Sequence, residues 1–94
     1  MMADGGRDYR ITSHALSEIR RRGIDESIVE QVLAQPEQEI PIRPGRVVRQ
    51  SRITMGETER RYLVRVIVDL DRDVPEVVTV YRTSKVDKYW RTVT

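Results

Sequence analysis

The chain contains a single histidine, His14, within the stretch SHALSEIRRRGI that spans residues 13–24. Histidine titrates near neutral pH, so an imidazole can accept or donate a proton in a reaction. If this stretch is helical, His14, Glu18, Arg21 and Arg22 lie on one face, because residues three and four apart are neighbours on a helix. Acid–base chemistry is therefore one interpretation of this group. An ordinary polar surface histidine is the other.

A second candidate group lies on predicted strands. Side chains alternate between the two faces of a strand, which places Arg61 and Arg65 together in the segment 59–70 and Thr79 with Tyr81 in the segment 76–82. We expect the apolar row Tyr62 to Leu70 and the pair Val78, Val80 to pack against helices, so that these four polar residues line the opposite face. Arginine and hydroxyl groups suit phosphate contacts. The alternative is a solvated polar face.

The stretch YRTSKVDKYW, residues 81–90, interleaves aromatic and basic side chains. Such a mixture can stack nucleic-acid bases and hold phosphates, which makes Arg82, Lys85, Lys88 and Tyr89 candidate RNA contacts. Alternatively, Tyr89 and Trp90 dock a C-terminal helix onto a small core.

Composition limits the class of protein. The chain has 94 residues, 38% hydrophobic and 34% charged, and predicts one small domain over residues 1–94 with a flexible start at residues 1–8. Without cysteine and with one histidine, we expect no disulfide, no metal site and no cofactor. The lack of cysteine predicts a protein of the reducing cytoplasm. We expect no membrane association, because neither a basic–apolar leader nor a long apolar run is present.

The predicted elements begin with helices. A helix starts at an N-cap, Thr12 or Ser13, runs to about Arg22 and stops at Gly23, and a second helix runs from its cap Asp25 to Gln35-Pro36. Before them, residues 9–12 form a short strand or an extended lead-in.

The remainder predicts strands. Residues 39–46, with two prolines and a glycine, form a loop or an edge segment, whereas 47–55, 59–70 and 76–82 are strands, the first two joined by a turn at 56–58. A short helix or irregular tail follows at 84–91. The predicted fold is α+β, with two N-terminal helices packed on a twisted antiparallel sheet of three to four strands.

HALSEIRRRGIDESIVEQVLAQPE, followed by this meander and by VVTVYRTSKVDKYW, resembles a family of small bacterial domains of unknown function related to the RelE-like and ParE-like toxins. The resemblance spans about Ile11 to Trp90. In the wider RelE-like ribonuclease superfamily it implies a metal-independent ribonuclease, with His14, Arg22, Thr79 and Tyr81 at the family's motif positions. The family pattern usually has a basic residue where this chain has Glu18. Arg21 could substitute for it.

The expected function is therefore an endoribonuclease that transfers the RNA phosphodiester to its own 2′-hydroxyl, in a toxin–antitoxin module. His14 would move one proton, Arg22 and Arg65 would stabilise charge, and Thr79 and Tyr81 would position the substrate. Glu18, Tyr81 and Lys85 stay open as the second proton-transfer group. The expected RNA contacts are Arg21, Arg61, Arg82, Lys88 and Tyr89.

The alternative function is a non-catalytic binding module. In that case the arginine-rich face would dock a protein partner, either a cognate antitoxin or a topoisomerase-type target. A third possibility is a relative in which this face is merely solvated. The oligomeric state is open on the sequence alone.

Overall fold

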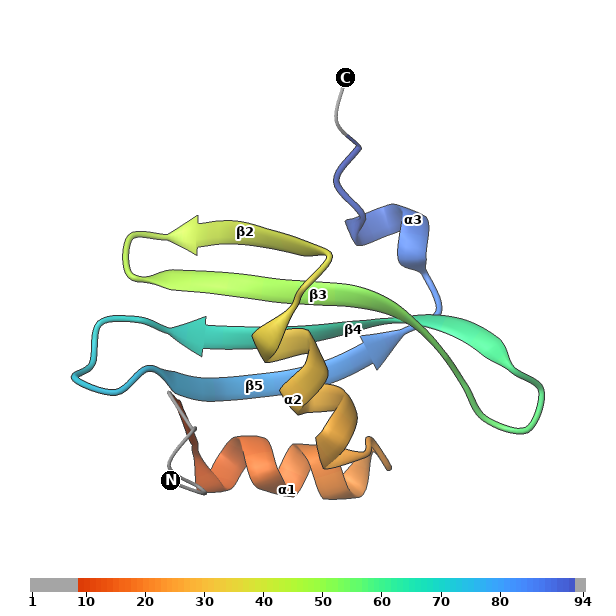
Figure 1. Ribbon diagram of the computed structural model, residues 1–94, viewed down its shortest axis with the longest axis horizontal. Helices are drawn as coiled ribbons and strands as arrows, with labels where there is room; N and C mark the ends of the chain where they lie inside the picture. Colours follow the sequence, from red (N-terminus) through yellow and green to blue (C-terminus); the bar gives the residue numbers. More distant parts are fainter. Residues whose placement is uncertain (1–8, 93–94) are drawn as a thin grey trace.

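The computed structural model describes residues 9–92, which form one five-stranded sheet with two helices against it and a short third helix near the C-terminus (Figure 1). The predicted flexible segment 1–8 lies outside the described residues. The elements are β1 (Arg10–Ile11), α1 (Ser13–Arg21), α2 (Glu26–Ala34), β2 (Gln38–Arg43), β3 (Arg46–Met55), β4 (Arg60–Asp69), β5 (Glu76–Thr83) and α3 (Val86–Tyr89).

The predicted fold class is wrong. The strand order is β1-β5-β4-β3-β2, and β1 pairs parallel with β5 while the other pairs are antiparallel, so the sheet is mixed and has five strands instead of three or four antiparallel ones. The two segments that the sequence left undecided, residues 9–12 and 39–46, contain most of the two edge strands of the sheet, β1 and β2. Neither carries a strand pattern: β1 has two residues, and β2 contains Pro41, which an edge strand tolerates because one of its sides needs no ladder bond.

Both longer helices begin and end at local signals. The Thr12 hydroxyl accepts from the Ala15 N–H at 3.1 Å, and the Asp25 carboxylate accepts from the Ser27 N–H at 2.9 Å, so each N-terminus has a side-chain cap. Gly23 follows α1 with φ of +65°, the left-handed conformation that ends a helix most easily at glycine. The predicted spans of these helices are confirmed to within about a residue.

The hairpin of β3 and β4 confirms the predicted alternation, but β5 departs from it. Val64, Val66 and Val68 are buried in the main core, whereas Leu70, which the prediction placed in the same row, is exposed just beyond the end of β4. Across β5 the register changes between Ile67↔Thr79 and Val68↔Val77, which leaves Val78 as an extra residue. The bulge shifts the phase of the strand by one residue, so the buried pair is Val77 and Val80 and the prediction for Val78 is wrong.

The two longer helices cover different parts of the sheet. In Figure 1, α2 lies across one face of it and α1 runs along the β5 side. The main core fills this space, and we call this face the helix face. Its buried members are Ala15, Ile19, Ile24, Val29, Val32, Leu33, Val47, Val64, Val66, Val68, Val77 and Val80.

The opposite face, here the far face, also has buried residues. Val48, Gln50 and Leu63 are at most 1% exposed, although they alternate with the main-core residues of their strands. The C-terminal segment, residues 84–92, covers part of this face, because the Gln50 side chain donates to the Tyr89 carbonyl at 3.2 Å. Within residues 9–92 no helix has the length and apolar character needed to cross a membrane.

Candidate functional site

Four predicted site residues meet on α1 around one carboxylate. Glu18 Oε2 lies 3.5 Å from His14 Nε2, 3.5 Å from an Arg22 guanidinium nitrogen and 3.9 Å from an Arg21 guanidinium nitrogen. The spacing of three and four residues brings them to one side of the helix, as the sequence predicts. We call these four residues the α1 cluster.

Glu18 is fixed by the sheet as well as by its own helix. Its side chain is 9% exposed, and its Oε1 accepts a hydrogen bond from the backbone N–H of Val80 at 3.3 Å. The strand β1 pairs with β5 only at Glu76 and Val77, so farther along β5 this edge has no neighbouring strand. The carboxylate therefore satisfies a backbone donor that the short edge strand leaves open.

The other members of the α1 cluster remain accessible. The side chains of His14, Arg21 and Arg22 are 69%, 67% and 38% exposed. Arg20, on the same helix, makes no ion pair with Glu18 within the described chain. The arrangement is an exposed imidazole next to a buried carboxylate, with two exposed guanidinium groups beside it. Such a group can hold an anion next to a side chain that transfers protons.

A second cluster lies on the far face and contains Arg65, Tyr81 and Tyr89. Arg65 donates from Nε to Gln50 Oε1 at 2.8 Å and from a terminal nitrogen to the Tyr81 hydroxyl at 2.7 Å. Its guanidinium carbon lies 4.5 Å from the centre of the Tyr89 ring. We call these residues, with Gln50, the far-face cluster. Arg65 is thereby held in place, and part of its hydrogen-bonding capacity is used within the protein.

Gln50 was not predicted from the sequence and is central to the far-face cluster. It is fully buried, and its amide nitrogen donates to Gln38 Oε1 at 2.8 Å and to the Tyr89 carbonyl while its oxygen accepts from Arg65. A glutamine in a strand gives no sequence signal for such a role. The one available hint is its place between Val48 and Arg52 on a face with other polar residues.

The two clusters approach each other through β5 without touching. Glu18 binds the backbone of Val80, whose chain neighbours Thr79 and Tyr81 pair across to Ile67 and Arg65 of the far face. Among residues 9–92, no hydrogen bond or ion pair joins His14 to Thr79 or Tyr81. Thr79 is half-buried on the far face of β5, opposite Ile67.

The remaining predicted contacts are spread over several places. Arg61 is exposed on β4, Lys85 is exposed at the start of α3, and the Lys88 ammonium lies 5.4 Å from the Tyr89 ring centre. Arg82 is separate from all of these, because it pairs with Val64 on the helix face. There its guanidinium carbon lies 4.9 Å from the ring centre of Tyr62, a residue that the sequence assigned to the core row.

Arg52 joins the residue before β2 to the C-terminal segment through an ion pair with Glu37 and a stacked Trp90 ring. Arg52 donates from Nε and a terminal nitrogen to the Glu37 carboxylate, each at 3.0 Å, and its guanidinium carbon lies 3.9 Å from the centre of the Trp90 ring. The Arg52 side chain and backbone N–H hold the pKa of Glu37 below its ordinary value, and the Glu37 carboxylate raises the pKa of Arg52.

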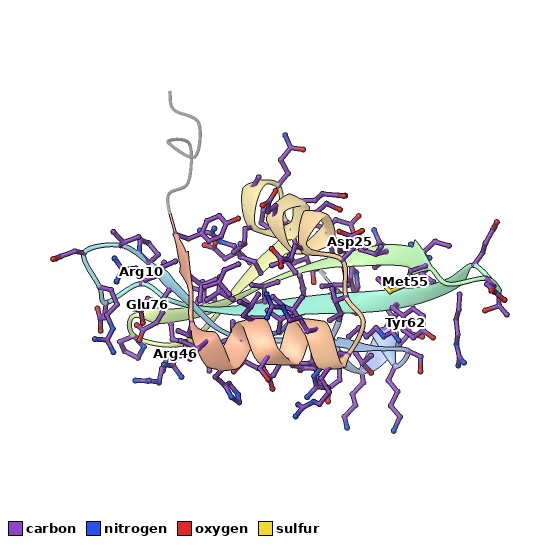
Figure 2. The ribbon with its side chains drawn as sticks, turned by 90° about the horizontal axis from the view of Figure 1, so that it is seen from below. Arg10, Asp25, Arg46, Met55, Tyr62 and Glu76 are labelled. Atoms are coloured by element: carbon purple, nitrogen blue, oxygen red, sulfur yellow. The ribbon has the colours of Figure 1, made fainter. Side chains whose placement is uncertain are left out.

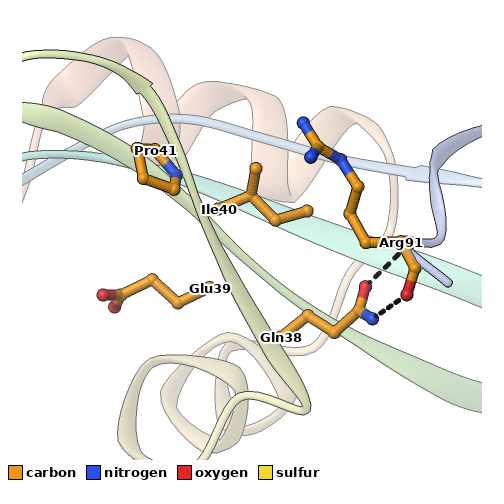
Figure 3. A pocket seen from close by; sticks show the side chains of 5 residues that line it. All are labelled: Gln38, Glu39, Ile40, Pro41 and Arg91. Atoms are coloured by element: carbon orange, nitrogen blue, oxygen red, sulfur yellow. Dashed lines mark hydrogen bonds between the residues drawn. The ribbon is translucent and has the colours of Figure 1, made fainter. Parts of the chain in front are cut away.

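An open pocket of about 310 Å³ borders edge strand β2 and is lined by Gln38, Glu39, Ile40, Pro41 and Arg91 (Figure 3). Gln38 bonds twice with the backbone of Arg91, accepting from its N–H at 3.1 Å and donating to its carbonyl at 2.6 Å. None of the predicted site residues lines this pocket. In the described part of the chain, no group of three or more histidine or acidic side chains is placed to hold a metal ion.

Comparison with known proteins assigns the chain to a family. A family described as a domain of unknown function, DUF4258, matches residues 11–82. This span contains the α1 cluster, Arg65 and Tyr81, and it ends before α3 and Tyr89. No curated protein and no solved structure matches the chain. Because the match covers well over half of its length, the chain belongs to the DUF4258 family, whose function is unknown.

Proposed function

We propose that the protein is a metal-independent endoribonuclease that cleaves RNA by transferring the phosphodiester to its own 2′-hydroxyl. The observation that carries the proposal is the α1 cluster, in which the exposed His14 lies 3.5 Å from the buried carboxylate of Glu18 with two arginines beside it. A phosphodiester docked on Arg21 and Arg22 would lie next to the imidazole. Cleavage of this kind needs a proton acceptor and positive charge in one place.

In the proposed reaction His14 accepts the proton of the 2′-hydroxyl. The 2′-oxygen attacks phosphorus, the bond from phosphorus to the 5′-oxygen breaks, and the products are a 2′,3′-cyclic phosphate and a 5′-hydroxyl that takes up one proton. Arg22 and Arg21 stabilise the charge on the phosphoryl oxygens. Glu18 acts as a positioning residue that orients the imidazole, as carboxylates do for other histidine bases.

The leaving 5′-oxygen also needs a proton donor, and Glu18, Tyr81 and Lys85 are the candidates. The Tyr81 hydroxyl accepts from Arg65 at 2.7 Å in the far-face cluster, and within residues 9–92 no hydrogen bond or ion pair joins it to His14. The Glu18 carboxylate already accepts the Val80 N–H and lies beside His14, Arg21 and Arg22. Lys85 is exposed, and its backbone N–H bonds to the Thr83 hydroxyl.

We further propose a cytoplasmic protein related to the RelE-like toxins, with a cognate antitoxin as its partner. The support is the resemblance of the His14 helix and the last strand to that family, together with a chain that lacks cysteine. Fold-level likeness carries little about activity, so this part depends on the cleavage experiment below.

A non-catalytic binding module is the second candidate function. The observation that favours it is that Glu18 partly neutralises the very cations that would hold phosphate. The exposed arginines would then dock an acidic segment of a protein partner, antitoxin or topoisomerase-type target, instead of a phosphodiester.

The deciding experiment incubates the purified protein with total RNA and, separately, with translating ribosomes, both in EDTA. We expect RNA fragments ending in cyclic phosphate, and we expect His14→Ala to abolish them while keeping the circular dichroism spectrum and melting temperature of the parent. Arg22→Gln and Arg20→Gln form a matched pair, since only Arg22 contacts Glu18. Absence of cleavage in both preparations would reject the nuclease and leave the binding module.

A further inference from the structure

The two ends of the sheet differ in how their arginines are neutralised. At the β1 end, Arg10 and Arg72 lie 3.9 Å and 3.8 Å from Glu76 carboxylate oxygens, and Arg46 lies 3.4 Å from Asp69. Figure 2 shows Arg10, Arg46 and Glu76 gathered at this end. The positive charges here are largely balanced by carboxylates of the protein, so little positive electrostatic potential remains to attract an anionic ligand.

At the opposite end of the sheet, beside the β3–β4 hairpin, two arginines have no carboxylate partner in the described part of the chain. Arg60 and Arg82 form no ion pair within residues 9–92, and both face an aromatic ring instead. Their guanidinium carbons lie 6.0 Å and 4.9 Å from the centre of the Tyr62 ring, and Arg82 also donates to the Met55 sulfur at 3.1 Å. Met55 and Tyr62 lie together in Figure 2, at the end opposite Glu76.

This part of the sheet is only partly covered: Met55 packs against the main core, and Tyr62 lies past the end of α1 in Figure 2. The hairpin continues past the ends of α1 and α2 in Figure 1, and the side chains of Tyr62 and Met55 are half-buried. An aromatic ring on an open strand surface, flanked by guanidinium groups, is a common platform for an unpaired base, with the arginines close to its phosphates.

We infer that Tyr62, Arg60 and Arg82 form a subsite that stacks an unpaired base of single-stranded RNA. The inference rests on the proposed function and specifies its substrate as unpaired rather than double-stranded RNA, because only an unpaired base can offer its face to Tyr62. Glu57 and Glu59 in the hairpin turn would repel phosphates. The bound strand therefore runs over the sheet and not around the turn, toward the end of α1 that points to the hairpin (Figure 1).

Binding can be measured apart from cleavage. The probe is a fluorescein-labelled oligouridine with 2′-O-methyl groups, which lacks the nucleophile of the proposed reaction, and anisotropy reports its binding. We expect Tyr62→Leu to weaken binding by about tenfold, the usual effect of losing one stacked base, and Tyr62→Phe to bind like the parent. Arg60→Gln should weaken binding more than Arg43→Gln, which removes an exposed arginine from the opposite end of the sheet.

Each outcome decides one question. The inference is overturned if the parent does not bind the probe, if Tyr62→Leu binds as tightly as the parent, or if an RNA duplex or polyglutamate competes as well as single-stranded RNA, the last indicating a general polyanion surface. Cleavage of unmodified RNA is scored separately. A parent that binds the probe through Tyr62 but never cleaves RNA would refute the nuclease and keep the subsite. A parent that cleaves RNA while Tyr62→Leu binds the probe normally would keep the nuclease and refute the subsite.

Discussion

The carboxylate of Glu18 accepts a hydrogen bond from the backbone N–H of Val80, 62 residues later in the chain, at 3.3 Å. A helix side chain thus takes the place that a longer neighbouring strand would have along β5. The same carboxylate lies 3.5 Å from His14, so one buried group joins the edge of the sheet to the proposed proton-transfer residue.

Glu18→Ala should therefore destabilise the fold, whereas Glu18→Gln should be milder. Alanine leaves the Val80 N–H without its acceptor, at a cost of about 1–3 kcal/mol, and glutamine retains an oxygen for that bond. Urea unfolding measures the free energy of both variants. Ser17→Ala, an exposed neighbour on α1, is the control and should change stability by less than about 0.5 kcal/mol. Equal stability of parent and Glu18→Ala would contradict the anchoring role.

The His14→Ala variant should separate activity from stability. The imidazole side chain is 69% exposed, so its removal should change the free energy of unfolding by less than about 0.5 kcal/mol. If His14 is the general base, the cleavage rate should fall by about a hundredfold or more. The initial rate on one RNA and a thermal melt of the same preparation test both statements. A variant that unfolds would show instead that His14 is structural.

Gln50→Leu should release the C-terminal segment from the far face. The substitution keeps the approximate volume but removes the partner of Arg65 Nε, Gln38 and the Tyr89 carbonyl. We expect a loss of about 1–3 kcal/mol, because buried polar groups are left unpaired. Trp90 is the only tryptophan and stacks on Arg52, so its fluorescence reports the release as a shift to longer wavelength. Gln35→Leu, at an exposed position, should leave the emission unchanged.

Acid should weaken the ion pair between Glu37 and Arg52, the residue on which Trp90 stacks. The Arg52 guanidinium and N–H keep the pKa of Glu37 below its ordinary 4.5 in the folded state, so the unfolded state binds the proton first as pH falls. This contribution to stability is complete above the ordinary value and is lost as pH falls below 4.5 and through the lowered pKa.

The measurement is urea unfolding of the parent and of Glu37→Gln at pH 7 and at successively lower pH, followed by Trp90 fluorescence. The difference in stability between the two proteins should shrink as pH falls through this window. A difference that stays constant would mean that the Glu37–Arg52 pair contributes nothing through its charge.

Local features of the chain were predictable because they depend on residues a few positions apart. Thr12 and Asp25 cap helices, Gly23 ends one, and the spacing of His14, Glu18 and Arg22 places them on one side of a turn. The alternation of β4 likewise separates Val64 and Val66 from Arg65 whatever the rest of the chain does.

Long-range relationships were decided only by the tertiary structure. The pairing of β1 with β5 and the edge position of β2 depend on which strand each segment meets. The bulge at Val78 was likewise not predictable, because Val77 and Val78 are both valine and the sequence does not indicate which of them faces the core. The neighbours of Gln50 and Tyr62 were decided in the same way: Gln50 is buried under the C-terminal segment, and Tyr62 lies past the end of α1 (Figure 2). The physical reason is that periodicity determines which side of an element a residue occupies, whereas its partners depend on the packing of elements far apart in the chain.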